Sequence, residues 1–402
     1  KELQTAVSND RGSAEARYWL GVALLQDKKG TQAEAEWNEA VRIDPRHIRA
    51  YLALAQYKLG GGDADGAIRY SREALKSNPD SAEARLALGT ALFAKRYYKD
   101  AIAEFESFLK QNPGNSQGLY RLGMSYAALG EAARAEAMLE SALKANPADL
   151  QPLAGLVNLY MTRKQPERAA QRINAEIQRS PQSAGLYYEL LGQVYAAQRS
   201  FGKAEEAYKR AVALDKDRLS AYSLLAQVYA AQKSFDKAIA EMQKVLEANP
   251  ESGQTHVILG VLYETQKNRE RAEHHYREAL KIDPGFAVAA NNLAWMLAES
   301  GGNLDEALKL AQSAKERMPE NVNISDTLGW IYYKRGAYRS AIDLLEECVK
   351  KESQNATFHY HLGMAYYKSG DLRRARESLN QALNLDPNMP QSYDIKEIIG
   401  KM

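Results

Sequence analysis

Histidines and a lone cysteine are the residues of this 402-residue chain with the clearest capacity for metal chemistry. Two ligands of one metal ion must project from the same helix face, which requires a spacing of three or four residues. His359 and His361 are two residues apart and His274 and His275 are adjacent, so neither pair is expected to chelate an ion. Cys348 is the only cysteine, which excludes a disulfide within the chain and a cysteine-rich cluster. The sequence therefore predicts no metal site.

A glycine-rich stretch, Gly60 to Asp63, is the remaining candidate for chemistry. A phosphate-binding GxxxxGK[ST] loop is absent, and this stretch stands between two helical patterns, where it predicts a turn. Nucleophile, base and orienting group do not recur together, and the carboxylates are scattered along solvated helix faces. We therefore expect no catalytic residue and no cofactor, and we predict that the chain is not an enzyme.

Charge and composition limit the classes of partner. The chain has 53 basic and 51 acidic residues, interspersed along its length, whereas nucleic-acid binding needs a concentrated basic stripe. Apolar residues make up 45% of the chain, which is enough to bury a large core, and no apolar run approaches the roughly 18 residues of a membrane span. We expect a folded chain that has no nucleic-acid partner and no membrane span in this segment.

The prolines reveal an internal repeat. Nine of the twelve are separated by 34 or 35 residues, or by 68 or 69 where one is missing: Pro45, Pro79, Pro113, Pro147, Pro181, Pro250, Pro284, Pro319 and Pro387. Between them the apolar residues follow helical spacing, with a short polar or glycine-containing break near each midpoint. The sequence therefore predicts repeated pairs of helices throughout the chain.

Aligned on this period, the units resemble the tetratricopeptide repeat, which has an aromatic residue, Leu-Gly and Tyr in its first helix and Ala, an aromatic residue and Pro later. Residues 188–211 and 259–284 carry the best copies. The resemblance implies an all-α, right-handed superhelical solenoid of antiparallel helix pairs. Residues 1–13 match the second helix of a truncated preceding repeat, 14–389 hold eleven units, and 390–402 form a capping helix. The units are expected to start at residues 14, 48, 82, 116, 150, 185, 219, 253, 287, 322 and 356.

Small residues recur where the two helices of a unit should cross. Gly260 in a first helix and Ala272 in the following second helix are one such pair, and a larger side chain there is expected to overpack the crossing. Glu176 replaces the usual small residue, next to an extra residue near Gly185. One unit cannot bury its apolar side alone, so the units must stack.

The resemblance also implies that one face of each first helix looks into a groove. In the last three units this face carries aromatic residues beside Asp and Lys, a composition typical of binding hot spots. The expected anchors are Trp295, Trp330, Tyr333, Tyr360 and Tyr367. The alternative is that these side chains pack against the next first helix. The predicted partner-binding residues are Asn291, Trp295, Asp326, Trp330, Tyr333, Lys334, Tyr360, Met364, Tyr367 and Lys368.

A smaller apolar set lies near the N-terminal end. We interpret it as a packing surface covered by preceding repeats rather than as a binding site. Its members are Tyr18, Val22, Leu25, Leu52, Leu86 and Phe93.

The predicted function is a scaffold that binds a peptide, helix or partner protein in the groove. One alternative is a self-assembling platform, that is, a homo-oligomer. Another is a targeting module of an enzyme whose catalytic domain lies outside this segment. Residues 291–311, NNLAWMLAESGGNLDEALKLA, and 326–336, DTLGWIYYKRG, resemble bacterial tetratricopeptide proteins associated with exopolysaccharide synthesis and export. This implies a bacterial multiprotein assembly.

Overall fold

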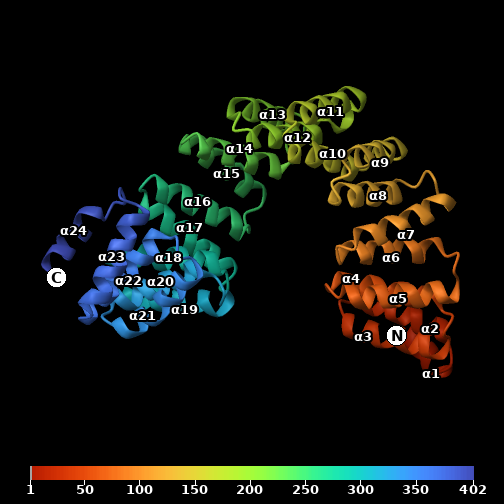
Figure 1. Cartoon of the computed structure of the whole chain (residues 1–402), viewed down its shortest axis with the longest axis horizontal. Helices are drawn as coiled ribbons and strands as arrows, with labels where there is room; N and C mark the ends of the chain where they lie inside the picture. Colours follow the sequence, from red (N-terminus) through yellow and green to blue (C-terminus); the bar gives the residue numbers. More distant parts are fainter. Residues whose placement is uncertain (1) are drawn as a thin grey trace. The chain divides into compact units, whose positions relative to one another are not determined.

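The computed structural model describes residues 2–402, and it confirms an all-α fold built from antiparallel helix pairs (Figure 1). These residues form 24 α-helices and one 3-10 turn, and none of them is in a strand. Within that range, every helix is too short or too polar to cross a membrane. Contacts divide the chain into an N-terminal half, residues 1–198, and a C-terminal half, residues 199–402.

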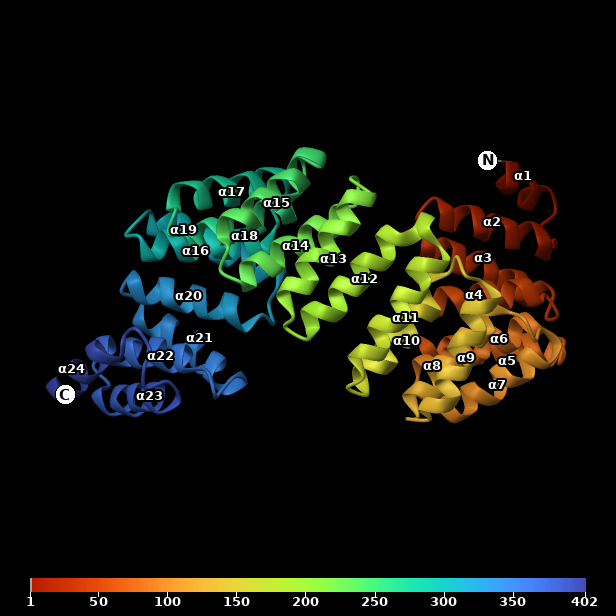
Figure 2. The same cartoon turned by 90° about the horizontal axis from the view of Figure 1, so that it is seen from above.

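The N-terminal half contains the first twelve helices, which stack in chain order (Figures 1 and 2). Their bounds are α1 Glu2–Asn9, α2 Ala14–Gln26, α3 Gly30–Ile43, α4 Ile48–Gly60, α5 Ala64–Ser77, α6 Ala82–Ala94, α7 Tyr98–Gln111, α8 Ser116–Ala128, α9 Ala132–Ala145, α10 Leu150–Thr162, α11 Pro166–Arg179, the 3-10 turn η1 Pro181–Ser183 and α12 Ala184–Ala197.

The C-terminal half stacks in the same manner. Its helices are α13 Phe201–Leu214, α14 Leu219–Ala231, α15 Phe235–Ala248, α16 Gly253–Thr265, α17 Arg269–Ile282, α18 Ala287–Glu299, α19 Leu304–Arg317, α20 Val322–Lys334, α21 Tyr338–Lys351, α22 Ala356–Ser369, α23 Leu372–Leu385 and α24 Ser392–Lys401.

The even-numbered helices from α2 to α22 are the first helices of the expected units. All but α12 begin at the residue where the repeat pattern starts a unit; α12 begins at Ala184, one residue early. Neighbouring first helices lie side by side, as α4 with α6 and α20 with α22. In each half they form a shared surface, called here the first-helix face. At the C-terminal end, α24 buries Ile395 against Leu379 and Met389, as a capping helix would.

Glycine in the first helix makes room for a large side chain of the second helix. A Cβ atom at Gly260 would lie 2.4 Å from the ring of Tyr276, and one at Gly21 would lie 2.4 Å from Trp37. The expectation paired these glycines with alanines such as Ala272. The structure shows instead that the closest contact comes from the residue four positions after the alanine, one helical turn further along.

Replacing Gly260 with alanine is expected to lower the free energy of unfolding by about 1–3 kcal/mol through overpacking. Tyr276 is fully buried and its hydroxyl donates to Glu264 at 2.8 Å, so the ring has little room to move. The matched control is Gly202→Ala, where the added Cβ meets nothing within 4 Å. Urea denaturation of both variants checks this, and equal stability of the Gly260 variant and the parent protein would refute it.

Candidate functional site

Three first helices carry the ten residues expected to bind a partner. These ten residues are called here the C-terminal aromatic patch. Asn291 and Trp295 lie on α18, residues 326–334 lie on α20, and residues 360–368 lie on α22. Lys334 and Lys368 are exposed, two residues are buried, and the other six are half-buried. Only part of the patch is therefore accessible to a partner.

Trp330 is one of the two buried members, with 5% of its surface exposed. Its ring stacks on His361, with centroids 4.1 Å apart, and on Tyr333, at 4.5 Å. Its indole N–H donates to Glu299 Oε1 at 2.8 Å. Trp330 was expected as an anchor, but the ring is buried between neighbouring first helices, because His361 of the next first helix stacks on it.

Asp326 is the other buried member, at 6% exposure. Both of its carboxylate oxygens accept from Nδ1–H of buried His361, at 2.8 and 3.0 Å. His361 was expected only as a surface or partly buried histidine that does not bind metal, and the repeat pattern alone did not predict this role. The sequence signal for this contact was the separation of 35 residues from Asp326. This is one 34-residue repeat plus one residue, so the two side chains lie next to each other on adjacent first helices.

Glu299 connects the buried part of the patch to its exposed part. Lys334 Nζ lies 3.0 Å from Glu299 Oε1 and 5.4 Å from the centre of the Trp330 ring. Burial alone would raise the pKa of Glu299, but hydrogen bonds from Trp330 and Lys334 and the lysine charge lower it. This exposed carboxylate therefore has a pKa below its ordinary value.

Packing also explains much of the half-buried remainder. Tyr360 and Met364 pack against the core that α24 closes, and Tyr333 and Tyr367 pack against the core between α21 and α23. Burial raises the pKa of the Tyr360 hydroxyl to about 12. Partner binding by the patch stays a prediction, and within it Asp326 and Trp330 can act only as supports for the residues above them.

The N-terminal half has a clearer hollow, called here the N-terminal groove. It consists of two pockets of about 730 and 580 Å³ that share Leu52 and Gln56 and so adjoin each other. The first pocket is lined from α2 to α4 and the second from α4 to α8. Five of the six residues interpreted as a covered packing surface line it: Tyr18, Val22, Leu25, Leu52 and Leu86. In this structure they are therefore accessible, whereas Phe93 contacts Tyr98.

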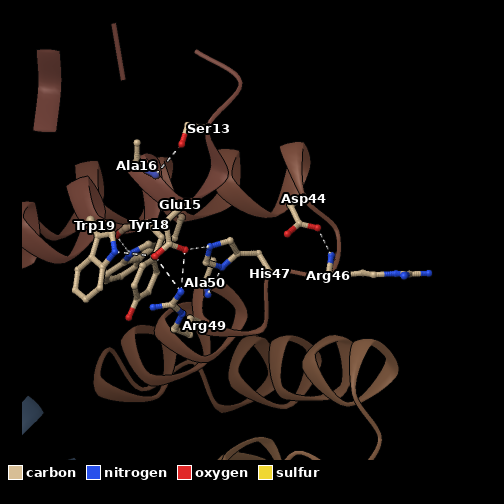
Figure 3. Close-up of polar contacts among 11 residues, drawn as sticks. Ser13, Glu15, Ala16, Tyr18, Trp19, Asp44, Arg46, His47, Arg49 and Ala50 are labelled. Atoms are coloured by element: carbon tan, nitrogen blue, oxygen red, sulfur yellow. Dashed lines mark hydrogen bonds and ion pairs between the residues drawn. The ribbon is translucent and has the colours of Figure 1, made fainter. Parts of the chain in front are cut away.

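A polar cluster closes the α2 end of this half, centred on the carboxylate of Glu15 (Figure 3). Glu15 accepts from Trp19 Nε1 at 2.8 Å, from Arg49 at 2.9 Å and from His47 Nε2 at 3.1 Å. Because His47 Nδ1 accepts from the backbone N–H of Ala50, its proton must lie on Nε2. Burial alone would raise the pKa of Glu15, but these hydrogen bonds and the Arg49 charge outweigh burial, so the pKa lies below its ordinary value.

The remaining candidates for chemistry are structural. Cys348 is buried, and burial raises the pKa of its thiol to about 12. His256 and His275 bring their Nδ1 atoms within 2.9 Å across α16 and α17, a contact that their spacing in the sequence did not predict. Within residues 2–402, no group of three or more His, Cys, Asp or Glu side chains could hold a metal ion.

The His256 and His275 pair predicts a loss of stability in acid. Burial and the neighbouring histidines lower the pKa of His275 to about 4, below its ordinary value of 6.5. The unfolded state therefore binds this proton first, and the contribution of His275 is lost as the pH falls from about 6.5 to about 4. Urea midpoints across this range should fall less for His275→Gln than for the parent protein; parallel curves would contradict the prediction.

Stacked helix pairs with a hollowed first-helix face define a helical-repeat protein. Models of the tetratricopeptide repeat family match residues 1–48, 52–116 and 189–253; residues 92–149, 126–194 and 332–397; and residues 253–286. The chain belongs to the tetratricopeptide repeat family. Proteins with repeats of this type generally mediate protein–protein interactions and are typically non-catalytic scaffolds.

A solved structure shows the same fold at low sequence identity. The APC/C hetero-tetramer Cut9–Hcn1 contains a chain that is 12% identical, with a TM-score of 0.51, and the match covers 98% of this chain and 97% of that one. A tetratricopeptide repeat protein from Parabacteroides merdae is 18% identical, with a TM-score of 0.48 and coverage of 62% and 96%. Yeast Tom70 is 16% identical, with a TM-score of 0.45 and coverage of 96% and 95%. No curated protein matches the sequence.

Proposed function

We propose that this chain is a protein-interaction scaffold that docks a peptide, helix or partner protein on its first-helix face. The N-terminal groove carries this proposal, since two adjoining pockets of several hundred Å³ are large enough for several partner side chains. A preformed groove also avoids the cost of ordering on its own side of the interface. The chain itself has no catalytic role in this proposal.

The C-terminal aromatic patch is proposed as a second contact surface. Tyr367 is half-buried and Lys368 is exposed, with its Nζ 5.8 Å from the centre of the Tyr367 ring. Aromatic side chains beside a cation are the residue types that most often dominate binding energy. Trp330 and Asp326 beneath them hold α20 and α22 in register.

A display library of random peptides, panned on the full chain, tests this function. Peptides selected on the parent protein are expected to bind the double variant Tyr367→Ala, Lys368→Ala about tenfold more weakly if they dock on the patch. The matched control is Tyr393→Ala, Lys396→Ala, which removes the same residue types from exposed positions of α24. Failure to enrich any peptide on the parent protein would contradict the scaffold function.

The finer proposal is that the partner belongs to a bacterial multiprotein assembly for exopolysaccharide export. It is supported by the amino-acid sequences of residues 291–311 and 326–336, which resemble those of proteins of that class. Loss of polymer export on deletion of the coding sequence, with restoration by the parent protein, tests it. Unchanged export would remove this proposal and leave the scaffold function standing.

A further inference from the structure

The N-terminal groove changes character along its length. At the α2 end its lining is mostly apolar and aromatic, with Val22, Leu25 and Tyr57, and the cation there, Arg49, is already paired with Glu15. At the α8 end it gains amides and a cation, namely Asn115, Gln117 and Arg121. A partner that fits the whole groove must therefore be apolar at one end and must offer hydrogen-bond acceptors at the other.

Arg121 is the charged group at the polar end. It is half-buried, and no carboxylate among residues 2–402 forms an ion pair with it. Its Nε atom is buried without a hydrogen-bond partner. Arg85 on the neighbouring helix α6 also has a buried Nε without a partner, but its guanidinium pairs with Glu104 at 3.3 Å. The Arg121 guanidinium instead lies 5.9 Å from the centre of the Tyr120 ring. A half-buried guanidinium with no ion-pair partner keeps donors for a ligand, and a carboxylate is the group that best satisfies it.

The neighbouring amide has a donor to spare for the same acceptor. Asn115 Oδ1 accepts from the backbone N–H of Gly118, which caps α8, so its NH2 group is left to donate. Glu83 is the acidic residue in the same lining, and it accepts from the Ser81 hydroxyl at 3.3 Å. Its charge disfavours a second carboxylate near α6, so the groove suits a partner with a single acid placed at Arg121.

The first-helix face does not end at Arg121. Helix α10 lies beside α8, and it continues the face with exposed Ala154 and Asn158. A small residue and an amide leave room for a main chain to run on past the guanidinium. The carboxylate is therefore expected on a side chain within the partner segment rather than at its C-terminus.

We propose that the N-terminal groove binds an internal partner segment that places apolar side chains over Leu52 and Leu86 and an Asp or Glu side chain on Arg121. This inference rests on the proposed scaffold function and adds the class of ligand and its location. The apolar side chains supply affinity, and the single acid fixes register and direction.

The test is to pan a random 12-residue peptide display library on the parent protein and, separately, on Arg121→Glu. Peptides from the parent are expected to combine large apolar residues with one internal Asp or Glu, and those from Arg121→Glu to carry Lys or Arg instead. Arg121→Met, which keeps the aliphatic stem, should bind the parent-selected peptides at least tenfold more weakly. Helical circular dichroism confirms that each variant folds.

The outcomes separate this inference from the scaffold function. Peptides that are enriched on the parent but bind Arg121→Met equally well would overturn the inference and leave the scaffold function intact. Peptides that require a free C-terminal carboxylate would also overturn it. If nothing is enriched, both fail. If light scattering shows that a second copy of the chain fills the groove and Leu86→Glu disperses it, the partner-segment proposal is overturned as well.

Discussion

Replacing Trp330 with alanine is expected to lower the free energy of unfolding around α20 and α22 by about 3–5 kcal/mol. The ring is 5% exposed and stacks on His361 and Tyr333, so its removal leaves a cavity between two first helices. It also leaves Glu299 without the indole donor. Repeat arrays unfold in parts, so amide hydrogen exchange of α20 and α22 is the suitable measurement. A loss of 3 kcal/mol corresponds to exchange faster by about a hundredfold.

Trp19→Ala is the matched control, since that indole is 44% exposed and donates to Glu15 at an exposed site. Its effect on exchange in α2 should be small. If Trp330→Ala left exchange in α20 unchanged but abolished peptide binding, Trp330 would be a contact residue rather than a support.

Replacing Arg172 with methionine is expected to cost about 3–5 kcal/mol, because it strands a buried charge. Arg172 donates to both oxygens of Glu140, at 2.7 and 3.0 Å, and to Glu176 Oε1 at 2.7 Å. The Glu176 side chain is 1% exposed, and its Oε2 has no hydrogen-bond partner. Methionine keeps the aliphatic stem of the side chain but removes the guanidinium and its charge, and Arg179 at 3.8 Å offers a weaker substitute.

Glu176→Ala gives the complementary result. Most other units carry a small residue at this position, and replacing a buried ion pair with an apolar group is often neutral or stabilising. We therefore expect Glu176→Ala to be at least as stable as the parent protein, and Arg172→Met with Glu176→Ala to recover most of the loss. Urea unfolding of the two variants, monitored in residues 1–198, measures both changes in the free energy of unfolding. If Glu176→Ala proved as damaging as Arg172→Met, the carboxylate itself would be stabilising.

The helix pairs were predictable because their signals are local. Proline, glycine and alanine recur at fixed positions, and each has a steric reason within one pair, as Gly260 against Tyr276 shows. The starts of the first helices follow from that pattern to within one residue.

The surfaces were not predictable because they depend on contacts between units. Trp295 and Trp330 occupy equivalent positions, yet only Trp330 is buried, since His361 stacks on it at 4.1 Å while Trp295 lies 5.8 Å from the same ring. The interpretation of the N-terminal apolar set as a surface covered by preceding repeats stays a prediction. Whether Leu52 and Leu86 are covered depends on neighbouring side chains such as Gln56 and Thr90. A repeat pattern does not predict how much apolar surface these side chains cover.

Photo-crosslinking tests most directly whether the first-helix face receives the partner. Gln56 is exposed and lines both pockets of the N-terminal groove, so a photoreactive phenylalanine analogue placed there should not disturb the fold. The same analogue at Tyr97, which is 52% exposed and lies in neither pocket, is the control. We predict crosslinks to a display-selected peptide at position 56 and not at position 97. Crosslinking at position 97 alone would place the partner elsewhere and contradict the account.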